Sequence, residues 1–232
     1  MLPNAEYLAT GIMVYRDVFK KEDNYIERLE KALGSDDNVK YSWKPGYTGY
    51  GSKNLKYRDC VDFKIKFNED ESLSAHTDNI KKEDQDDLDR NLIRIWQDAY
   101  YAQLPAVDDY RNMFGIAPLK YWESFNFIRY NEGQHFQVHS DHGYSYTCVL
   151  SLVGYINDDY EGGELYFDKL GLTIKPKAGD LYLFPSSYIY SHAAMPVTSG
   201  TKYSIVTMLD YLETAHTPEY RNLEAKYSGS LL

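Results

Sequence analysis

The stretch "GQHFQVHSDHGYSY" (133–146) holds three of the chain's six histidines, His135, His139 and His142, within eight positions. Its polar and apolar residues alternate as in a β-strand, in which positions i and i+2 point to the same face. His139 and Asp141 therefore share one face, and His142 points elsewhere. His135 has the same parity as His139, so it either lines the same pocket or lies on the strand surface.

A further histidine, His192, strengthens the case that His139 and Asp141 bind a metal. Alone, an HxD pair is a weak signal in a chain with 35 acidic residues. His192 follows the predicted strand "DLYLFP" (180–185), where it can return to the same end of a β-structure. Two imidazoles and one carboxylate form a facial triad with open positions, which is typical of non-haem Fe(II). Zinc is an alternative, although hydrolytic zinc also needs a base beside its bound water, and none is obvious. The other alternative is that the histidines only satisfy hydrogen bonds within a sheet.

Short aromatic and β-branched runs dominate the chain from about Lys120 to residue 209, divided by Gly, Pro, Asn and Asp. Turn signals stand at "EGG" (161–163) and "KPKAGD" (175–180). Helical spacing precedes these runs. This order predicts a mainly β protein with helical support (α+β), as a helix-buttressed β-sandwich or jelly roll.

The first 119 residues are predicted to be mixed. The expected elements are a strand at 11–19, a helix at 20–34 ended by Gly34, an acidic loop and helix start at 69–90, a helix at 88–104 that ends before Pro105, and a short helix at 107–114. Segment 41–58, rich in Gly and Tyr, is either a surface loop or a lid over a site.

Composition limits the class of partner. The formal charge of −10 argues against nucleic acid or an anionic membrane as the main partner. Cys60 and Cys148 form no CxxC pair, so neither a zinc site nor a disulfide framework is indicated. The first residues do not resemble a signal peptide, and no run of 18 apolar residues occurs. We therefore expect a soluble, cytoplasmic protein.

Lys202 is the remaining candidate site residue. It begins the otherwise apolar strand "KYSIVTML" (202–209), ten residues after His192. A lysine that enters a core is costly unless it meets an anion. The alternative is that its ammonium group reaches the surface.

These pieces together resemble the 2-oxoglutarate and Fe(II)-dependent dioxygenases, most closely the prolyl 4-hydroxylase-like branch. The matching segments are "RYNEGQHFQVHSD", "DDYEGGELYF", "KPKAGDLYLFPS" and "HAAMPVTSGTKYS", which lie between about residues 120 and 210 in the family's order. The resemblance implies a single domain over 1–232: helical support and lid segments at 1–119, a double-stranded β-helix core at 120–212, and a C-terminal tail at 213–232.

The resemblance also implies roles for residues. His139, Asp141 and His192 would hold Fe(II), and 2-oxoglutarate would chelate the metal while its C5 carboxylate pairs with Lys202. Tyr130 matches the family tyrosine that hydrogen-bonds this co-substrate. O2 would be the oxidant, succinate and CO2 would be released, and L-ascorbic acid binding is implied as well.

Three departures from the family pattern concern the substrate side. Ser151 stands where the family often has a tyrosine among the co-substrate contacts, the connection from Asp141 to Thr147 is short, and a late tryptophan is replaced around Met208.

The leading prediction is hydroxylation of a prolyl residue in a peptide or protein, with Trp43, Tyr47 and Tyr50 stacking on pyrrolidine rings. The alternatives are the same chemistry on a small molecule such as a free amino acid, and a non-catalytic jelly-roll binding protein. A nucleic-acid demethylase is disfavoured by the acidic charge. The sequence does not indicate an oligomeric state.

Overall fold

The computed structural model describes residues 1–34, 40–47, 53–143 and 147–216. Its α-helices are α1 (Tyr25–Ala32) and α2 (Asp87–Phe114). The 3-10 helices are η1 (Lys21–Asp23), η2 (Lys82–Asp84), η3 (Tyr188–Tyr190) and η4 (Glu213–His216).

Antiparallel strands make up the rest of the framework. Within the described residues, the largest sheet has eleven strands. Nine lie side by side in the order β1 (Ala5–Ala9), β2 (Ile12–Tyr15), β15 (Leu181–Pro185), β11 (Leu150–Tyr155), β18 (Lys202–Asp210), β9 (Phe125–Tyr130), β5 (Val61–Phe67), β6 (Leu73–Ala75) and β7 (Asp78–Ile80). Two short strands join this sheet at its side: β3 (Lys44–Pro45) pairs with β5, and β8 (Tyr121–Trp122) pairs with β18.

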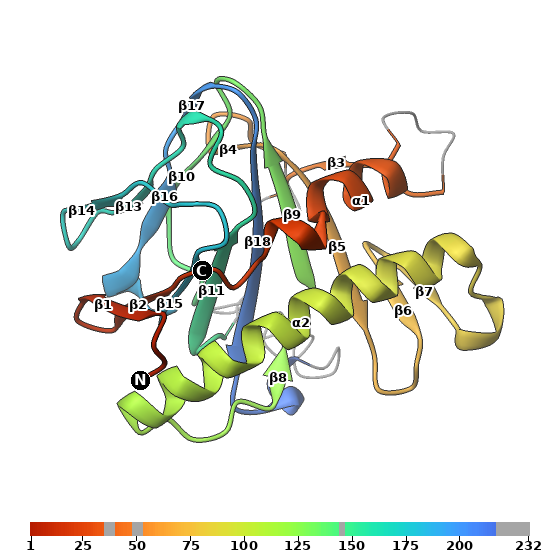
Figure 1. Ribbon diagram of the computed structural model, residues 1–232, viewed down its shortest axis with the longest axis horizontal. Helices are drawn as coiled ribbons and strands as arrows, with labels where there is room; N and C mark the ends of the chain where they lie inside the picture. Colours follow the sequence, from red (N-terminus) through yellow and green to blue (C-terminus); the bar gives the residue numbers. More distant parts are fainter. Residues whose placement is uncertain (35–39, 48–52, 144–146, 217–232) are drawn as a thin grey trace, which may run out of the picture.

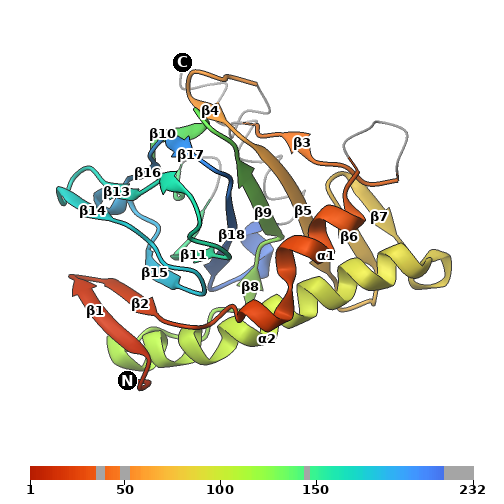
Figure 2. The same ribbon diagram turned by 45° about the horizontal axis from the view of Figure 1, so that its top comes forward.

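A five-stranded sheet faces it, in the order β14 (Leu172–Ile174), β13 (Leu165–Phe167), β16 (His192–Ala194), β10 (His135–His139) and β4 (Arg58–Asp59). The pair β12 (Glu161–Gly162) and β17 (Val197–Ser199) stands beside it. Figure 2 shows β10 and β16 across from β9 and β18, with both α-helices outside the larger sheet. The predicted jelly roll with helical support is confirmed.

Residue parity divides the larger sheet into a helix-facing side and an inner side. The helix-facing side chains of β5, β9 and β18 join the core under α2, and they include Phe63, Ile65, Phe125, Phe127 and Ile205. Each such burial stabilises the fold by roughly 1.5–3 kcal/mol. The even-numbered residues of the same strands consequently face the space between the sheets.

The first 119 residues contribute strands as well as helical support. β2 pairs with β15, and β5 pairs with β9, so this region completes both sides of the larger sheet. The pattern of "VDFKIKF" had no place among the predicted strands because its charged residues hide a period of two.

The predicted end of a helix before Pro105 is wrong, since α2 runs through it as one helix. Proline removes one backbone hydrogen bond and crowds the preceding turn. Pro105 lies on the exposed side, where water can satisfy the released carbonyl, while Ala106, Val107 and Tyr110 continue the buried stripe beyond it. Tertiary packing therefore outweighs the local break.

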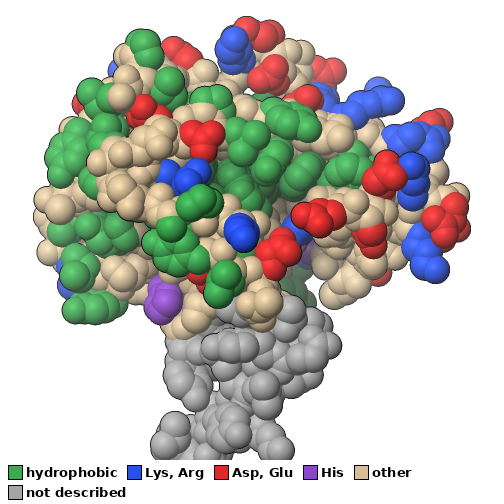
Figure 3. Space-filling model, turned by 90° about the horizontal axis from the view of Figure 1, so that it is seen from below, with side chains coloured by type: hydrophobic (Ala, Val, Ile, Leu, Met, Phe, Trp, Pro, Cys, Tyr) green, Lys and Arg blue, Asp and Glu red, His purple; other side chains and the backbone are tan. Residues whose placement is uncertain are grey.

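The predicted acidic loop at 69–90 is also corrected. It contains the hairpin of β6 and β7, in which Leu73 and Ala75 are buried and add strands to the sheet. Four apolar residues among nine acids gave too little periodicity to reveal it. Charged side chains of both signs gather at this end of the molecule (Figure 3).

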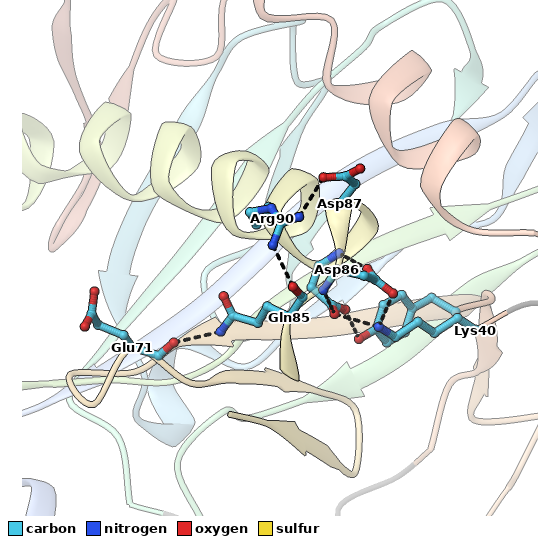
Figure 4. A network of polar contacts seen from close by, with 8 residues as sticks. Lys40, Glu71, Gln85, Asp86, Asp87 and Arg90 are labelled. Atoms are coloured by element: carbon cyan, nitrogen blue, oxygen red, sulfur yellow. Dashed lines mark hydrogen bonds and ion pairs between the residues drawn. The ribbon is translucent and has the colours of Figure 1, made fainter. Parts of the chain in front are cut away.

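A polar network fixes the start of α2 to the strand region (Figure 4). Asp86 and Asp89 form a capping box, in which each carboxylate accepts from the other's backbone N–H at 2.9 Å. Asp89 is fully buried and also accepts from the Tyr41 hydroxyl and the Lys40 ammonium, both at 2.6 Å. The exposed partner pair Arg90–Asp87 lies beside it.

Cys60 and Cys148 are both buried, and no disulfide joins them, as the lack of a CxxC pair led us to expect. No helix in the described ranges combines the length and the apolar character needed to cross a membrane.

We expect Asp89→Ala to lower the free energy of unfolding by about 2–4 kcal/mol, because it removes part of a capping box and leaves the buried Tyr41 hydroxyl without its acceptor. Urea unfolding followed by circular dichroism measures the change. Asp87→Ala is the matched control, since its carboxylate is exposed in the same helical turn, and it should leave the midpoint unchanged. Equal effects of the two variants would contradict the role of the buried network.

Candidate active site

The two histidines of the triad face each other across a strand pair. β10 ends at His139, which pairs in register with His192 at the start of β16. Asp141 follows two residues after His139, so its carboxylate meets both rings. Its Oδ1 lies 3.5 Å from His139 Nε2 and its Oδ2 lies 3.8 Å from His192 Nε2. One potential ligand atom from each residue lies within 4.8 Å of the others.

Backbone carbonyls set the tautomer of both rings. His139 Nδ1 donates to the carbonyl oxygen of Gln137 at 2.8 Å, and His192 Nδ1 donates to that of Tyr190 at 3.1 Å. The Nε2 lone pairs of both rings are therefore directed to the third ligand, as a metal requires. Burial lowers the pKa of His192 to about 4, against the opposing effect of Asp141, so this ring is neutral at physiological pH.

The carboxylate of Asp141 is held from behind by hydroxyl groups. Ser151 Oγ donates to Asp141 Oδ2 at 2.6 Å, and Ser186 Oγ lies 2.8 Å from Ser151 Oγ. Because the only hydroxyl proton of Ser151 is used on Asp141, Ser186 is the donor in the second bond. Burial by itself would raise the pKa of Asp141, but the two imidazoles and the Ser151 hydroxyl hold it below its usual value. This ligand is therefore anionic.

A stack of side chains orients the His139 ring. The Phe136 ring stacks on it, with ring centroids 3.7 Å apart. The guanidinium carbon of Arg58 lies 4.9 Å from the centre of the Phe136 ring. Arg58 is itself buried and bound to Asp62 at 2.7 Å. Strand β4 thus brings a residue of the N-terminal region next to the metal-ligand strand.

The triad lies in a cavity of about 830 Å³ between the two sheets. The lining is apolar near its centre and polar at its ends. It comprises Tyr47, Tyr57, Arg58, Lys64, Glu123, Ser124, Asn126, Ile128, Tyr130, Phe136, His139, Ser140, Asp141, Gly143, Val153, Leu165, His192, Ala194, Lys202, Ser204, Val206 and Met208.

Lys202 lies on the inner wall of this cavity and is only 1% exposed. Its Nζ donates to the carbonyl oxygen of Gly163 at 2.9 Å and lies 4.4 Å from the ring centre of Tyr130, its cross-strand neighbour. Among the residues that the structure describes, no carboxylate forms an ion pair with it. Burial lowers the pKa of Lys202 to about 7, although Glu164 opposes this shift. An anion bound in the cavity would restore its charge.

Residues 125–209 match the family model described as the 2OG-Fe(II) oxygenase superfamily. The segment that carries the triad and Lys202 is thus assigned to this superfamily. Fe(II) and 2-oxoglutarate are typical of it, and the HxD and distal histidine are present here as the triad.

Individual relatives of this superfamily point to prolyl hydroxylases. A protein of Acanthamoeba polyphaga mimivirus, provisionally named a prolyl 4-hydroxylase, is 28% identical over 135 residues, which are 49% of this chain and 55% of the viral protein. Prolyl 4-hydroxylase 13 of Arabidopsis thaliana is 31% identical over 115 residues, 37% of this chain and 42% of the plant protein. The chain thus spans about half the length of the curated relatives it matches.

A solved structure supports the fold assignment. A prolyl hydroxylase from Trichoplax adhaerens, in complex with a hypoxia inducible factor oxygen degradation domain peptide fragment, superimposes with a TM-score of 0.59. The match covers 92% of this chain and 86% of that one, at 15% sequence identity. The oxygenase fold therefore extends beyond the segment that matches in sequence.

The structure brings most of the predicted oxygenase site residues together. His139, Asp141, His192, Lys202 and Tyr130 all line one cavity. Ser151 does not line it, because its hydroxyl is turned to Asp141, so its position lends no support to the predicted contact with the co-substrate.

The remaining histidines lie outside the triad. His142 is exposed and turned away from the triad, as strand parity predicts. Its Nδ1 lies 2.8 Å from the carbonyl oxygen of Cys148. His135 lies against the segment that precedes β4, with Nε2 3.2 Å from the carbonyl oxygen of Lys56, and it is absent from the cavity lining.

The predicted lid segment 41–58 lies partly outside the described residues, which exclude Tyr50. Tyr47 does line the cavity. The prediction for Trp43 is corrected: its ring is buried against Tyr203, with Arg129 5.0 Å from its centre, and is not part of the cavity. Trp43 is therefore part of the hydrophobic core next to α1.

Sequence reasoning missed Arg58, Phe136 and Ser186. Phe136 carried no usable signal, because residues three apart face opposite sides of a regular strand, and only the shift of register between Phe136 and His139 lets their rings stack. Arg58 carried none, since its approach depends on the pairing of β4 with β10 across 76 residues of sequence.

The donor set fits Fe(II). Two imidazoles and one carboxylate each offer a ligand atom within 4.8 Å of the others, and all three residues line a cavity with room for further ligands.

We expect His139→Ala and His192→Ala each to reduce the affinity for Mn(II) or Co(II), used in place of Fe(II), by at least about 100-fold, since each removes one of three protein ligands. Isothermal titration of the metal-free protein measures this. His142→Ala is the matched control, one position beyond Asp141, and should bind metal as the wild type does. Loss of metal in His142→Ala with retention in His139→Ala would show that the ligand assignment is wrong.

Proposed function

We propose that the protein is a 2-oxoglutarate- and Fe(II)-dependent dioxygenase that hydroxylates a prolyl residue in a peptide or protein. One observation carries this proposal: a facial triad and a buried lysine without a described carboxylate partner line the same cavity. A metal site alone would not need Lys202, and a binding protein would not keep both. The names of the relatives, and the peptide bound to the Trichoplax enzyme, support a prolyl substrate.

Each side chain of the site has a task in this reaction. Asp141, kept anionic, and the Nε2 atoms of the two histidines would hold the metal. Lys202 would hold the C5 carboxylate of 2-oxoglutarate, with the Tyr130 ring beside its ammonium. Ile128, Val153 and Leu165 line the space between and exclude water.

With O2 as the oxidant, the bound metal and 2-oxoglutarate would supply the chemistry that converts a C–H bond to C–OH, one oxygen atom entering the product and the other the released succinate, with loss of CO2. The contribution of this chain is to bind, orient and desolvate the reactants. Tyr47 and Tyr57 stand at the cavity wall, where a peptide would enter. The carbonyl of Tyr47 accepts from Arg58 at 2.7 Å, which ties this part of the predicted lid to the cavity wall.

The direct test is turnover. We expect the protein with Fe(II), ascorbate and 2-oxoglutarate to form succinate, and proline-containing peptides to gain 16 Da by mass spectrometry. Peptides in which 3,4-dehydroproline or alanine replaces proline are the controls for the site of oxidation. Succinate formation stimulated by free proline, with every peptide inert, would overturn the peptide assignment and leave the iron chemistry in place.

Lys202 gives a second test through its charge. We expect Lys202→Met to raise the KM for 2-oxoglutarate at least about 30-fold, since truncating one partner of a buried charge pair commonly costs 2–5 kcal/mol. Metal affinity should be nearly unchanged. In the wild type, the affinity for 2-oxoglutarate should fall as pH rises above about 7, because the free enzyme then has to take up a proton on binding.

The same substitution has the opposite effect on stability. The folded-state pKa of Lys202 lies below its unfolded value near 10.5, so the charged form costs stability below that pH, fully so below about 7. Lys202→Met should therefore gain more stability over the wild type at pH 6 than at pH 10, as thermal unfolding would show. A lower stability of Lys202→Met at pH 6, or an unchanged KM, would contradict a buried, anion-seeking lysine.

A further inference from the structure

A second lysine lines the cavity at the other end of the same wall. On β5, the even-numbered residues Asp62, Lys64 and Lys66 lie on the inner face, since Phe63 and Ile65 are in the core on the opposite face. Lys64 is half-buried and lines the cavity, whereas Lys66 does not line it. A half-buried charge on the inner wall costs desolvation free energy unless an opposite charge or a ligand compensates it.

The charge on Lys64 is not paired with a described carboxylate, although Glu123, which acts on Lys66, also lines the cavity. Within the described ranges, no ion pair or hydrogen bond of its side chain occurs. Asp62, the nearest carboxylate on the same strand face, is already bound to the Arg58 guanidinium at 2.7 Å and to the Asn126 amide at 3.3 Å. Lys66 differs, because its ammonium lies 4.9 Å from the Tyr121 ring centre and the carboxylates of Glu69, Glu123 and Glu213 act on it.

Asn126 adds an unused acceptor at the same place. It pairs in register with Lys64 and lines the cavity. Its Nδ2 donates to Asp62, and its buried Oδ1 has no hydrogen-bond partner. The opposite orientation of the amide would set its oxygen against a carboxylate, so Oδ1 is the atom left free. An orphaned buried acceptor lowers stability unless a ligand donates to it.

This pair of groups lies apart from Lys202 on the cavity wall. Lys202 pairs with Tyr130, four residues along β9 from Asn126, and Lys64 lies two strands away from β18. Strand geometry makes this a separation on the order of 16 Å between the lysine backbones. In the proposed function both ends of 2-oxoglutarate are already occupied, its C5 carboxylate by Lys202 and its other end by the metal. Lys64 and Asn126 are therefore left for the other reactant.

We propose that Lys64 and Asn126 form a substrate subsite that binds a carboxylate together with an N–H group. The ammonium of Lys64 would pair with the carboxylate, and Asn126 Oδ1 would accept from an amide or amine of the same substrate residue. This rests on the proposed function and names its substrate class: an amino-acid unit that carries a carboxylate. The carboxylate is either the side chain of an acidic residue beside the hydroxylated one or the α-carboxylate of a terminal or free residue.

The test uses probes that differ in one charge. One arm compares acetyl-Ala-Pro-Glu-amide with its Gln and Lys counterparts, and the other compares acetyl-Ala-Pro-Gly with a free carboxylate and with a carboxamide. Binding to the protein loaded with Mn(II) and 2-oxoglutarate is measured without O2 by isothermal titration. Turnover is measured separately with Fe(II) by succinate formation.

We expect the wild type to bind the carboxylate member of one arm about tenfold more tightly than its neutral partner, and this ratio to fall with added salt. Lys64→Met should bring the ratio to about one. Lys64→Glu should invert it in favour of the Lys peptide. Lys66→Met is the matched control, with the same charge on the same strand face, and should keep the wild-type ratio.

Two results would overturn the subsite: a ratio near one in both arms for the wild type, or equal losses in Lys64→Met and Lys66→Met. Succinate formation with every probe but no carboxylate preference leaves the dioxygenase and removes the subsite. A carboxylate preference in binding that depends on Lys64, with no consumption of 2-oxoglutarate, removes the dioxygenase and keeps the subsite.

Discussion

The pairing of β10 with β16 is the constraint on which the site depends. It places His139 opposite His192, 53 positions later in the chain, so that one metal ion or the Asp141 carboxylate can contact both rings. Everything around the pair serves to fix the two rings: carbonyls on both Nδ1 atoms, the Phe136 ring on one side of His139, and hydroxyls behind Asp141. The larger sheet is held in place because helices cover its outer face, and its register is set by the alternation of buried residues.

The inner wall of the larger sheet divides the cavity by charge. Lys202 and Tyr130 occupy one row of the wall, and Lys64 and Asn126 occupy a row four residues further along β9. Between these rows, Ile128 is apolar and the charge of Asp62 is neutralised by Arg58. Two lysines separated by a neutral stretch of this wall would suit the two anionic reactants that we propose.

How much of this could be predicted from the sequence depends on how local each signal is. The triad could be predicted, since strand parity and one distal histidine suffice, and the burial of Lys202 follows from the apolar strand that it begins. The β6–β7 hairpin could not, because Leu73 and Ala75 are diluted by acids. The helix was predicted to end before Pro105 because proline breaks local helix hydrogen bonding. The buried face that continues through Ala106, Val107 and Tyr110 keeps it helical. Trp43 misled because an aromatic residue in a Gly-rich segment fits a lid and a core equally well until the packing of Tyr203 and Arg129 is known.

The position of β18 has a consequence for how the chain acquires its fold. It is the last strand of the described residues, yet it lies in the middle of the larger sheet between β11 and β9 (Figure 1). During synthesis, β5 with β9 on one side and β11 with β15 on the other therefore wait as separate half-sheets with open inner edges until residue 210 has left the ribosome. Such edges favour association with other chains, and pairings of high sequence separation form slowly. The larger sheet is therefore completed only when β18, the strand that carries Lys202, inserts between β11 and β9. Until then, the unpaired inner edges of β11 and β9 are open to association with other chains.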